Sequence, residues 1–392
     1  MWYICGMEDN NRTDRIKKKA AGLLTLLESG VDMIKNNKNS PPPYEIVGYR
    51  GYGTSDYLYC RGRVLQNKGI VASGRDGAWR NLLNSYHRFE SDEVPGQTLQ
   101  ASYGGQKFEM TSNEEGYFML DTPLSNSLKP NISIWQSIEF ELQSPDTNRN
   151  KKLVNSDCQI LVPNQKAEYG VISDLDDTVL KSNVISKVKM IYLALFKNAY
   201  TRLAFRGVPA LYWALRKGSS GDQKNPIFYV SNSPWNLYDV IDEFMDVNHI
   251  PKGPVLLRDF GHANNPALSD AYKKHKYNET VKILETYPHL PFILIGDSGE
   301  KDADMYLEVA KNYPGRILCI YIRTVKDKKR TERVKKLAKG EINVPLLLIE
   351  DSLDIAKHAV SNGFITRQAM YRVNQSLYND RSSVVDFWLE EE

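Results

Sequence analysis

After Glu168 the sequence alternates short runs of apolar residues with longer stretches of helical character. This alternation is typical of an α/β fold, because strands that are apolar throughout are buried on both faces of a parallel sheet that helices cover. Six runs predict strands, each bounded by turn or charged residues: 169–173, 227–230, 255–257, 292–295, 317–322 and 344–349. We therefore predict that residues 166–392 form a doubly wound parallel sheet.

The first half of the chain has different periodicities. Between residues 44 and 165 apolar side chains recur at every second position, as at Leu58, Cys60 and Val64, which predicts half-buried strands in an all-β sandwich with one helix inserted at about 79–89. Residues 12–37 have apolar positions at helical spacing and predict an amphipathic helix, for which packing or dimerisation and membrane docking are alternatives. Because a proline run at 41–43 cannot continue that helix, residues 1–43 are interpreted as a helix and linker.

Charge and cysteine content exclude several classes of protein. The 392 residues carry a formal net charge of only +3, so nothing in the composition requires a nucleic-acid partner. The four cysteines are far apart in the sequence, which fits neither a zinc site nor a disulfide scaffold and favours a reducing, cytoplasmic location. No stretch has the ~18 apolar residues needed to span a bilayer, so we expect any membrane contact to be peripheral.

Polar clusters follow three of the predicted strands where each strand ends. They are Asp174–Thr178, Ser231–Ser233 and Asp297–Asp302. Because open parallel sheets bind ligands outside the carboxyl ends of their strands, we expect the three clusters to lie together. Asp174 and Asp176 face the same side of an extended backbone, where two carboxylates about 4 Å apart repel by roughly 4 kcal/mol unless a cation lies between them. Hard oxygen ligands without a nearby His or Cys predict Mg²⁺ rather than zinc.

The order of these clusters resembles the motifs of haloacid dehalogenase phosphatases. Asp174–Thr178 matches a DxDxT box, Ser231 a strand-end serine, and Gly296–Asp302 a GDxxxxD box, with basic residues between the last two. The resemblance implies a haloacid dehalogenase-like fold and phosphatase activity. The structural alternative for Asp174 is an acid that caps a helix or a turn.

A closer resemblance covers the chain from about Val47 onward. Tyr229–Trp235 and Ile295–Asp302 are similar to segments of the actin-patch-protein phosphatidate phosphatases, and Tyr49–Thr54 resembles the front domain of their bacterial-type members. This resemblance implies magnesium-dependent hydrolysis of phosphatidate to diacylglycerol and phosphate. The implied partner is an anionic phospholipid at a membrane surface.

The resemblance also implies roles for individual residues. Asp174 would be the nucleophile that forms an aspartyl-phosphate, and Asp176 would be the general acid and base. Ser231 and Asn232 would bind the phosphoryl group, although a helix N-cap is the structural alternative for Ser231. Thr178 is expected to brace the motif loop beside the substrate.

The implied metal ligands are Asp174, Asp297 and the backbone carbonyl of Asp176. Asp302 would support the water ligands of the metal. Two other acids could take that last role: Glu300 and Asp304. A purely structural acidic cluster is the alternative for the whole set.

The lysine that neutralises the phosphate is best placed at Lys276, where a helical stretch begins. The pattern leaves three other candidates: Lys273, Lys274 and Lys282. A solvated helix face is the structural alternative.

Residues 182–225 are more numerous than a simple crossover needs and predict a cap over the site. Apolar positions within 185–196 are flanked by Lys and Arg, which suits an anionic lipid, although a crossover helix buried on the sheet is an equal alternative. Two other functions remain open. The chain could hydrolyse a water-soluble phosphomonoester, or it could be a lipid-binding adaptor protein in which catalysis is incidental.

Overall fold

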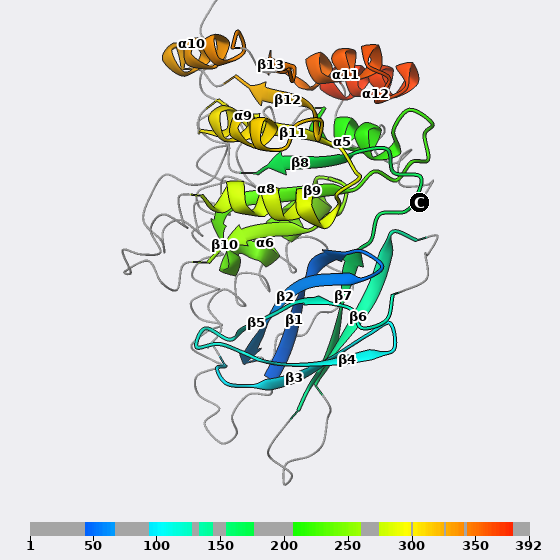
Figure 1. Ribbon diagram of the computed structural model, residues 1–392, viewed down its shortest axis with the longest axis vertical. Coiled ribbons are helices and arrows are strands. Elements are labelled where there is room, and N and C mark those ends of the chain that lie inside the picture. The colour runs from blue at the N-terminus through cyan, green and yellow to red at the C-terminus, as the bar shows by residue number, and fades with distance from the viewer. Residues whose placement is uncertain are drawn as a thin grey trace, which may run out of the picture.

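The computed structural model describes residues 44–66, 94–127, 133–143, 154–175, 207–259, 274–298, 301–324, 327–340 and 343–378. They form a β part, which ends at Leu161, and an α/β part, which begins at Gly170 and stands above the β part in Figure 1. The amphipathic helix predicted at 12–37 and the inserted helix predicted at 79–89 lie outside the described residues.

Seven strands make up the β part: β1 (Tyr44–Gly53), β2 (Tyr57–Gln66), β3 (Thr98–Tyr103), β4 (Gln106–Thr111), β5 (Tyr117–Pro123), β6 (Trp135–Leu142) and β7 (Asn155–Leu161). They pair in the order β4-β3-β6-β7-β1-β2-β5, and only β1 and β7 run parallel. The sheet encloses a core that includes Leu58, Phe118 and Phe140, and its edge strands β4 and β5 contact each other. The β part is therefore sandwich-like, and the alternating run at Leu58, Cys60 and Val64 lies in β2.

The glycines of β1 differ from what their sequence predicts. Glycines at positions 48, 51 and 53 predict turns at the entry to a strand, but the segment lies within β1. A Cβ atom on Gly51 would lie 2.2 Å from the backbone oxygen of Tyr59, and one on Gly48 would lie 2.7 Å from Cβ of Cys158. These glycines therefore allow the neighbouring strands β2 and β7 to approach β1 closely.

Replacing Gly51 with Ala should therefore destabilise the protein. The added methyl group meets backbone that cannot move aside as a flexible side chain would, and overpacking of this kind costs about 1–3 kcal/mol. Thermal unfolding of Gly51→Ala should show a lower melting temperature than the wild type. Gly340→Ala is the control, because the nearest atom to its added Cβ is Leu337 O at 3.1 Å. Equal melting temperatures for the two variants would contradict the argument.

All six predicted strands of the α/β part are present: β8 (Gly170–Asp174), β9 (Ile227–Pro234), β10 (Val255–Arg258), β11 (Phe292–Asp297), β12 (Ile317–Arg323) and β13 (Leu346–Ile349). They pair in the order β10-β9-β8-β11-β12-β13, and every pair is parallel. The order reverses at β8, between β9 and β11. In open parallel sheets this switch point is where a ligand-binding crevice forms.

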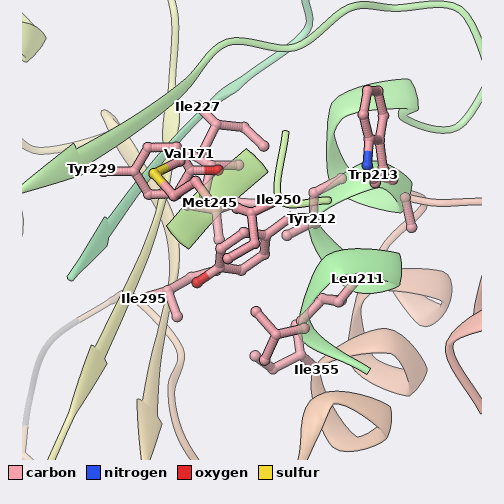
Figure 2. Close-up of a cluster of buried hydrophobic side chains, with 14 of the residues drawn as sticks. Val171, Leu211, Tyr212, Trp213, Ile227, Tyr229, Met245, Ile250, Ile295 and Ile355 are labelled. Atoms are coloured by element: carbon pink, nitrogen blue, oxygen red, sulfur yellow. The ribbon is translucent and has the colours of Figure 1, made fainter. Parts of the chain in front are cut away.

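Helices cover both faces of the parallel sheet. One face carries α5 (Val208–Lys217), α6 (Tyr238–Val247), α11 (Ser352–Ser361) and α12 (Arg367–Tyr378), and the other carries α8 (His275–Thr286), α9 (Asp302–Asn312) and α10 (Lys328–Leu337). Each face has its own core, because successive strand residues alternate between them: Tyr229 enters the first, and Phe228 and Val230 enter the second. Figure 2 shows Leu211 and Tyr212 of α5 in the first core near Ile250 and Ile295.

The two parts share their cores. Tyr49 and Tyr117 of the β part pack into the first core of the α/β part, and Tyr52 and Tyr59 pack into the second. For this reason β2 is buried along almost its whole length, where the alternating pattern predicted a half-buried strand. The outward face of β2 meets the α/β part instead of solvent.

Candidate active site

Three acids converge at the switch point of the parallel sheet. Asp174 ends β8, Asp297 ends the neighbouring strand β11, and Asp302 begins α9. One carboxylate oxygen from each lies within 4.8 Å of those of the other two. Asp297 and Asp302 are buried, with 4% and 2% of their surface exposed. The parallel strands thus bring together acids that are 123 residues apart in the sequence.

Asp302 is fixed by the strand that carries Asp297. The backbone N–H of Asp297 donates a hydrogen bond to Oδ2 of Asp302 at 3.1 Å. Gly296 leaves room for this carboxylate, since a Cβ atom there would lie 2.6 Å from Oδ2. Burial raises the pKa of the Asp302 carboxyl, and the Lys276 ammonium partly opposes that rise.

Lys276 supplies the cation of this cluster. It lies in the first turn of α8, is 6% exposed, and places Nζ 2.7 Å from Oδ1 of Asp174 and 3.4 Å from Oδ1 of Asp302. Lys274 is exposed, and Nζ of Lys282 contacts Asp121 of the β part at 2.5 Å. Lys273 lies outside the described residues. Of the three described candidates, only Lys276 reaches Asp174 in the structure.

The donor set fits a divalent metal ion. Three carboxylates lie close together in a largely buried site, with Lys276 among them and Arg323 beside the adjoining pocket. At a separation of 4.8 Å two carboxylates repel by about 3.5 kcal/mol in an effective dielectric of about 20. A divalent cation would relieve that repulsion, and carboxylate oxygens are the ligands that Mg²⁺ prefers.

Ser231 lies in a bulge of β9. Val230 pairs with Leu256 and Pro234 pairs with Arg258, so the three residues Ser231–Ser233 stand opposite the single residue Leu257. Bulges next to active sites redirect side chains away from the regular alternation. Ser231 is fully buried, and its Oγ accepts a hydrogen bond from the backbone N–H of Ser233 at 2.9 Å. Ser231 is not a helix N-cap, because the next helix, η1 (Trp235–Leu237), is preceded by Pro234.

The remaining sequence candidates are distributed as follows. Asn232 is half-buried in the same bulge. Asp176, Thr178 and Glu300 lie outside the described residues. Asp304 forms an ion pair with Arg333 at 2.5 Å and, among the described residues, is not part of the carboxylate cluster. Asp259, which directly follows β10, forms an ion pair with Arg61 of β2.

An apolar pocket opens beside the acids. Its volume is about 70 Å³, and Asp174 and Asp297 line it together with Arg323 at the end of β12. The other walls are mostly apolar: Leu175, Val208, Leu211, Tyr212, Ile250, Ile295, Ile349 and Ile355. Sequence reasoning missed Arg323 as a candidate, although the strand-end rule that found Asp297 applies to the neighbouring β12 as well.

The structure describes only the C-terminal part of the predicted cap, from residue 207 onward. Residues 176–206 lie outside the described residues, and the adjoining helix α5 packs against α11 and α12 while lining the pocket. Within the described part of the chain, no helix is long and apolar enough to cross a membrane.

Comparison with known proteins relates this site to a lipid phosphatase. Residues 169–324 match the model of the catalytic domain of phosphatidate phosphatase APP1. Phosphatidate phosphatase APP1 of Saccharomyces cerevisiae is 32% identical over 154 residues, which are 39% of this chain and 25% of the yeast protein. An uncharacterised protein of Schizosaccharomyces pombe is 27% identical over 221 residues, 56% of this chain and 35% of that protein.

The chain therefore spans about a quarter to a third of the length of these curated relatives. Among solved structures, the alignment with a carbohydrate acetylesterase from Xanthomonas citri covers 83% of this chain and 71% of the esterase. The sequence identity is 11% and the TM-score is 0.26, which is too low to indicate a shared fold. The matched segment contains Asp174, Ser231, Lys276 and the Asp297–Asp302 box. Residues 169–324 of this chain are therefore similar to the catalytic domain of phosphatidate phosphatase APP1.

Proposed function

We propose that this protein is a magnesium-dependent phosphatase of the haloacid dehalogenase superfamily that hydrolyses phosphatidate to diacylglycerol and phosphate. The observation that carries the proposal is the contact between Lys276 Nζ and Asp174 Oδ1 at 2.7 Å, beside two further carboxylates. A carboxylate that ends a strand next to a buried ammonium is suited to attack an anionic phosphoryl group, because the cation offsets the charge of the incoming phosphate.

In this mechanism Asp174 attacks phosphorus in line with the leaving oxygen and forms an aspartyl-phosphate, which water then hydrolyses. Asp176 donates a proton to the leaving alkoxide and later takes one from the attacking water. Ser231 and Asn232 hold phosphoryl oxygens, and Thr178 braces the loop that carries Asp176. Lys276 keeps its positive charge throughout and stabilises the charge that develops on the phosphoryl group.

Asp174, Asp297 and the Asp176 carbonyl would hold Mg²⁺, with Asp302 orienting its water ligands. When bound, the metal supplies positive charge that lets an anionic nucleophile approach an anionic ester. The close approach of three carboxylates in the described site supports this assignment, because carboxylate oxygens are the ligands that Mg²⁺ prefers.

The apolar pocket supports a lipid substrate. A phosphate ester bound at Asp174 would have its alcohol group beside a wall built mainly from aliphatic side chains and Tyr212. A lipid substrate requires contact with a membrane surface, and we propose that this contact is peripheral. Cys60, Cys158 and Cys319 are buried free thiols, which fits the cytoplasm as the proposed location.

Phosphate release from phosphatidate in mixed micelles tests this proposal directly. We expect turnover that requires micelles and magnesium and that a chelator abolishes. Water-soluble phosphomonoesters assayed in parallel should be poor substrates. Hydrolysis of soluble esters alone would support a phosphatase activity but contradict a lipid substrate. Binding of phosphatidate vesicles without hydrolysis of any ester would instead indicate an adaptor protein.

A further inference from the structure

Trp235 contacts two residues of the β part, and its ring also stacks on Tyr238 with a centroid distance of 6.2 Å. It lies four positions after Ser231 and is 4% exposed. The ring of Tyr49 stacks on it with a centroid distance of 5.4 Å and an interplanar angle of 9°, and Cζ of Arg61 lies 4.9 Å from the ring centroid. Tyr49 and Arg61 are directly opposite each other on the paired strands β1 and β2. One cross-strand pair therefore contacts this indole.

These contacts hold Trp235 by packing. Among the described residues the indole Nε1 of Trp235 has no hydrogen-bond partner, although the atom is buried. Without that hydrogen bond the orientation of the ring depends on the groups stacked against it. Removal of either neighbour should therefore let the indole move, and with it the backbone on either side.

The backbone before Trp235 needs such an anchor. Ser231–Ser233 form the bulge of β9, in which three residues stand opposite one residue of β10, so the regular ladder does not fix their position. Pairing resumes at Pro234, immediately before Trp235. The contact with Tyr49 and Arg61 therefore lies one residue after the strand pairing resumes.

Further contacts tie both strands around this bulge to the β part. The backbone N–H of Arg50 donates a hydrogen bond to the hydroxyl of Tyr238 at 2.9 Å, and the Arg50 guanidinium forms an ion pair with Asp242 of α6. Arg61 also pairs with Asp259, which directly follows β10, at 3.3 Å. Strands β1 and β2 thus contact the segments that follow β9 and β10.

We propose that Tyr49 and Arg61 are positioning residues for the phosphate-binding segment Ser231–Ser233, so that the β part completes the active site. Neither residue reaches the acids of the site in the described contacts; both act through Trp235. The inference rests on the proposed role of Ser231 in phosphoryl binding. Through these contacts the β part would affect the rate of the reaction.

Arg61→Ala tests the proposal against a matched control on the same strand. Arg63 is also a cation over an aromatic ring, with Cζ 4.6 Å from the Tyr117 centroid, and it is only 5% exposed. Arg63→Ala removes an equivalent contact within the β part and leaves Trp235 covered. A cation over an indole is worth a factor of about 2 to 30 in an equilibrium, and small misplacements of binding groups lower rates further. We therefore expect about a tenfold fall in kcat for Arg61→Ala and less than a twofold change for Arg63→Ala.

Four further variants separate the contacts. Asp259→Asn removes the ion pair to Arg61 but keeps the cation over Trp235, so its kcat should stay near that of the wild type. Arg61→Lys keeps a positive charge over the ring and should recover part of the loss. Tyr49→Phe keeps the stacked ring and should be active, whereas Tyr49→Leu should resemble Arg61→Ala. Melting temperatures of all variants identify any that fail to fold.

Binding of inorganic phosphate in the presence of magnesium, measured by calorimetry, gives a readout that needs no substrate. Arg61→Ala should weaken it several-fold, and Arg63→Ala should not. Equal kcat and equal phosphate affinity in these two folded variants would overturn the inference even if the protein is a phosphatase. A different outcome is that the wild-type protein hydrolyses no ester but binds phosphate in a way that depends on Arg61. That outcome would support the positioning role of Arg61 and contradict the proposed phosphatase function.

Discussion

Asp174→Asn should lower phosphate release from phosphatidate by at least about 10³-fold, because the amide that replaces the carboxylate is a poor nucleophile. The variant keeps the size and shape of the side chain at the end of β8. It removes one of three mutually repelling carboxylates but also the buried ion pair with Lys276, so these two effects on stability oppose each other. Steady-state turnover and melting temperature, measured together, separate loss of chemistry from loss of structure.

Asp304→Asn is the matched control. Asp304 is an acid on α9, two residues after Asp302, but its carboxylate pairs with Arg333 and lies outside the described cluster. We expect its turnover to stay within about twofold of the wild type, because exposed ion pairs contribute little. Acid quenching with labelled substrate should trap a phosphorylated wild-type protein and no phosphorylated Asp174→Asn. More than a tenth of wild-type activity in Asp174→Asn would refute the assignment of the nucleophile.

Strand-end positions explain why so much of this site could be predicted. The six apolar runs of the α/β part predicted six strands, and every one is present. Once the strands are parallel, their carboxyl ends must share one edge, so Asp174 and Asp297 are brought together by topology alone. Lys276 was harder to select, because four lysines lie close together in the sequence and only the direction of α8 distinguishes them.

The contacts between the two parts could not be predicted from periodicity. Gly48 and Gly51 have turn chemistry in the sequence, yet they lie within β1 because β7 and β2 approach it closely. The pairing of Tyr49 with Arg61 depends on strand register, and their contact with Trp235 depends on how one fold docks on another. Periodicity reports which face of an element is buried, but not what covers that face.

The second large effect is expected at Lys276. Lys276→Ala should lower kcat by about 10²- to 10³-fold, the usual loss when one group that stabilises transition-state charge is removed. Nζ of Lys276 lies between Asp174 and Asp302, so its loss also leaves three carboxylates facing one another without an internal cation. The affinity for Mg²⁺ should therefore rise while kcat falls. A lysine that only supported the fold would not produce this split.

Lys282→Ala is the control on the same helix. Its ammonium lies 3.8 Å from the Tyr59 ring centroid and contacts Asp121, so it joins α8 to the β part without reaching Asp174. Lys274→Ala removes an exposed lysine from the residue before α8. We expect both variants to keep kcat within about threefold of the wild type, as exposed or partly exposed ion pairs are weak. A folded Lys276→Ala that retained full turnover, or a Lys282→Ala with an equal loss, would move the phosphate-neutralising role away from Lys276. Magnesium titrations of kcat on all three variants decide between these outcomes, because only the loss of a cation inside the carboxylate cluster changes the metal affinity and kcat in opposite directions.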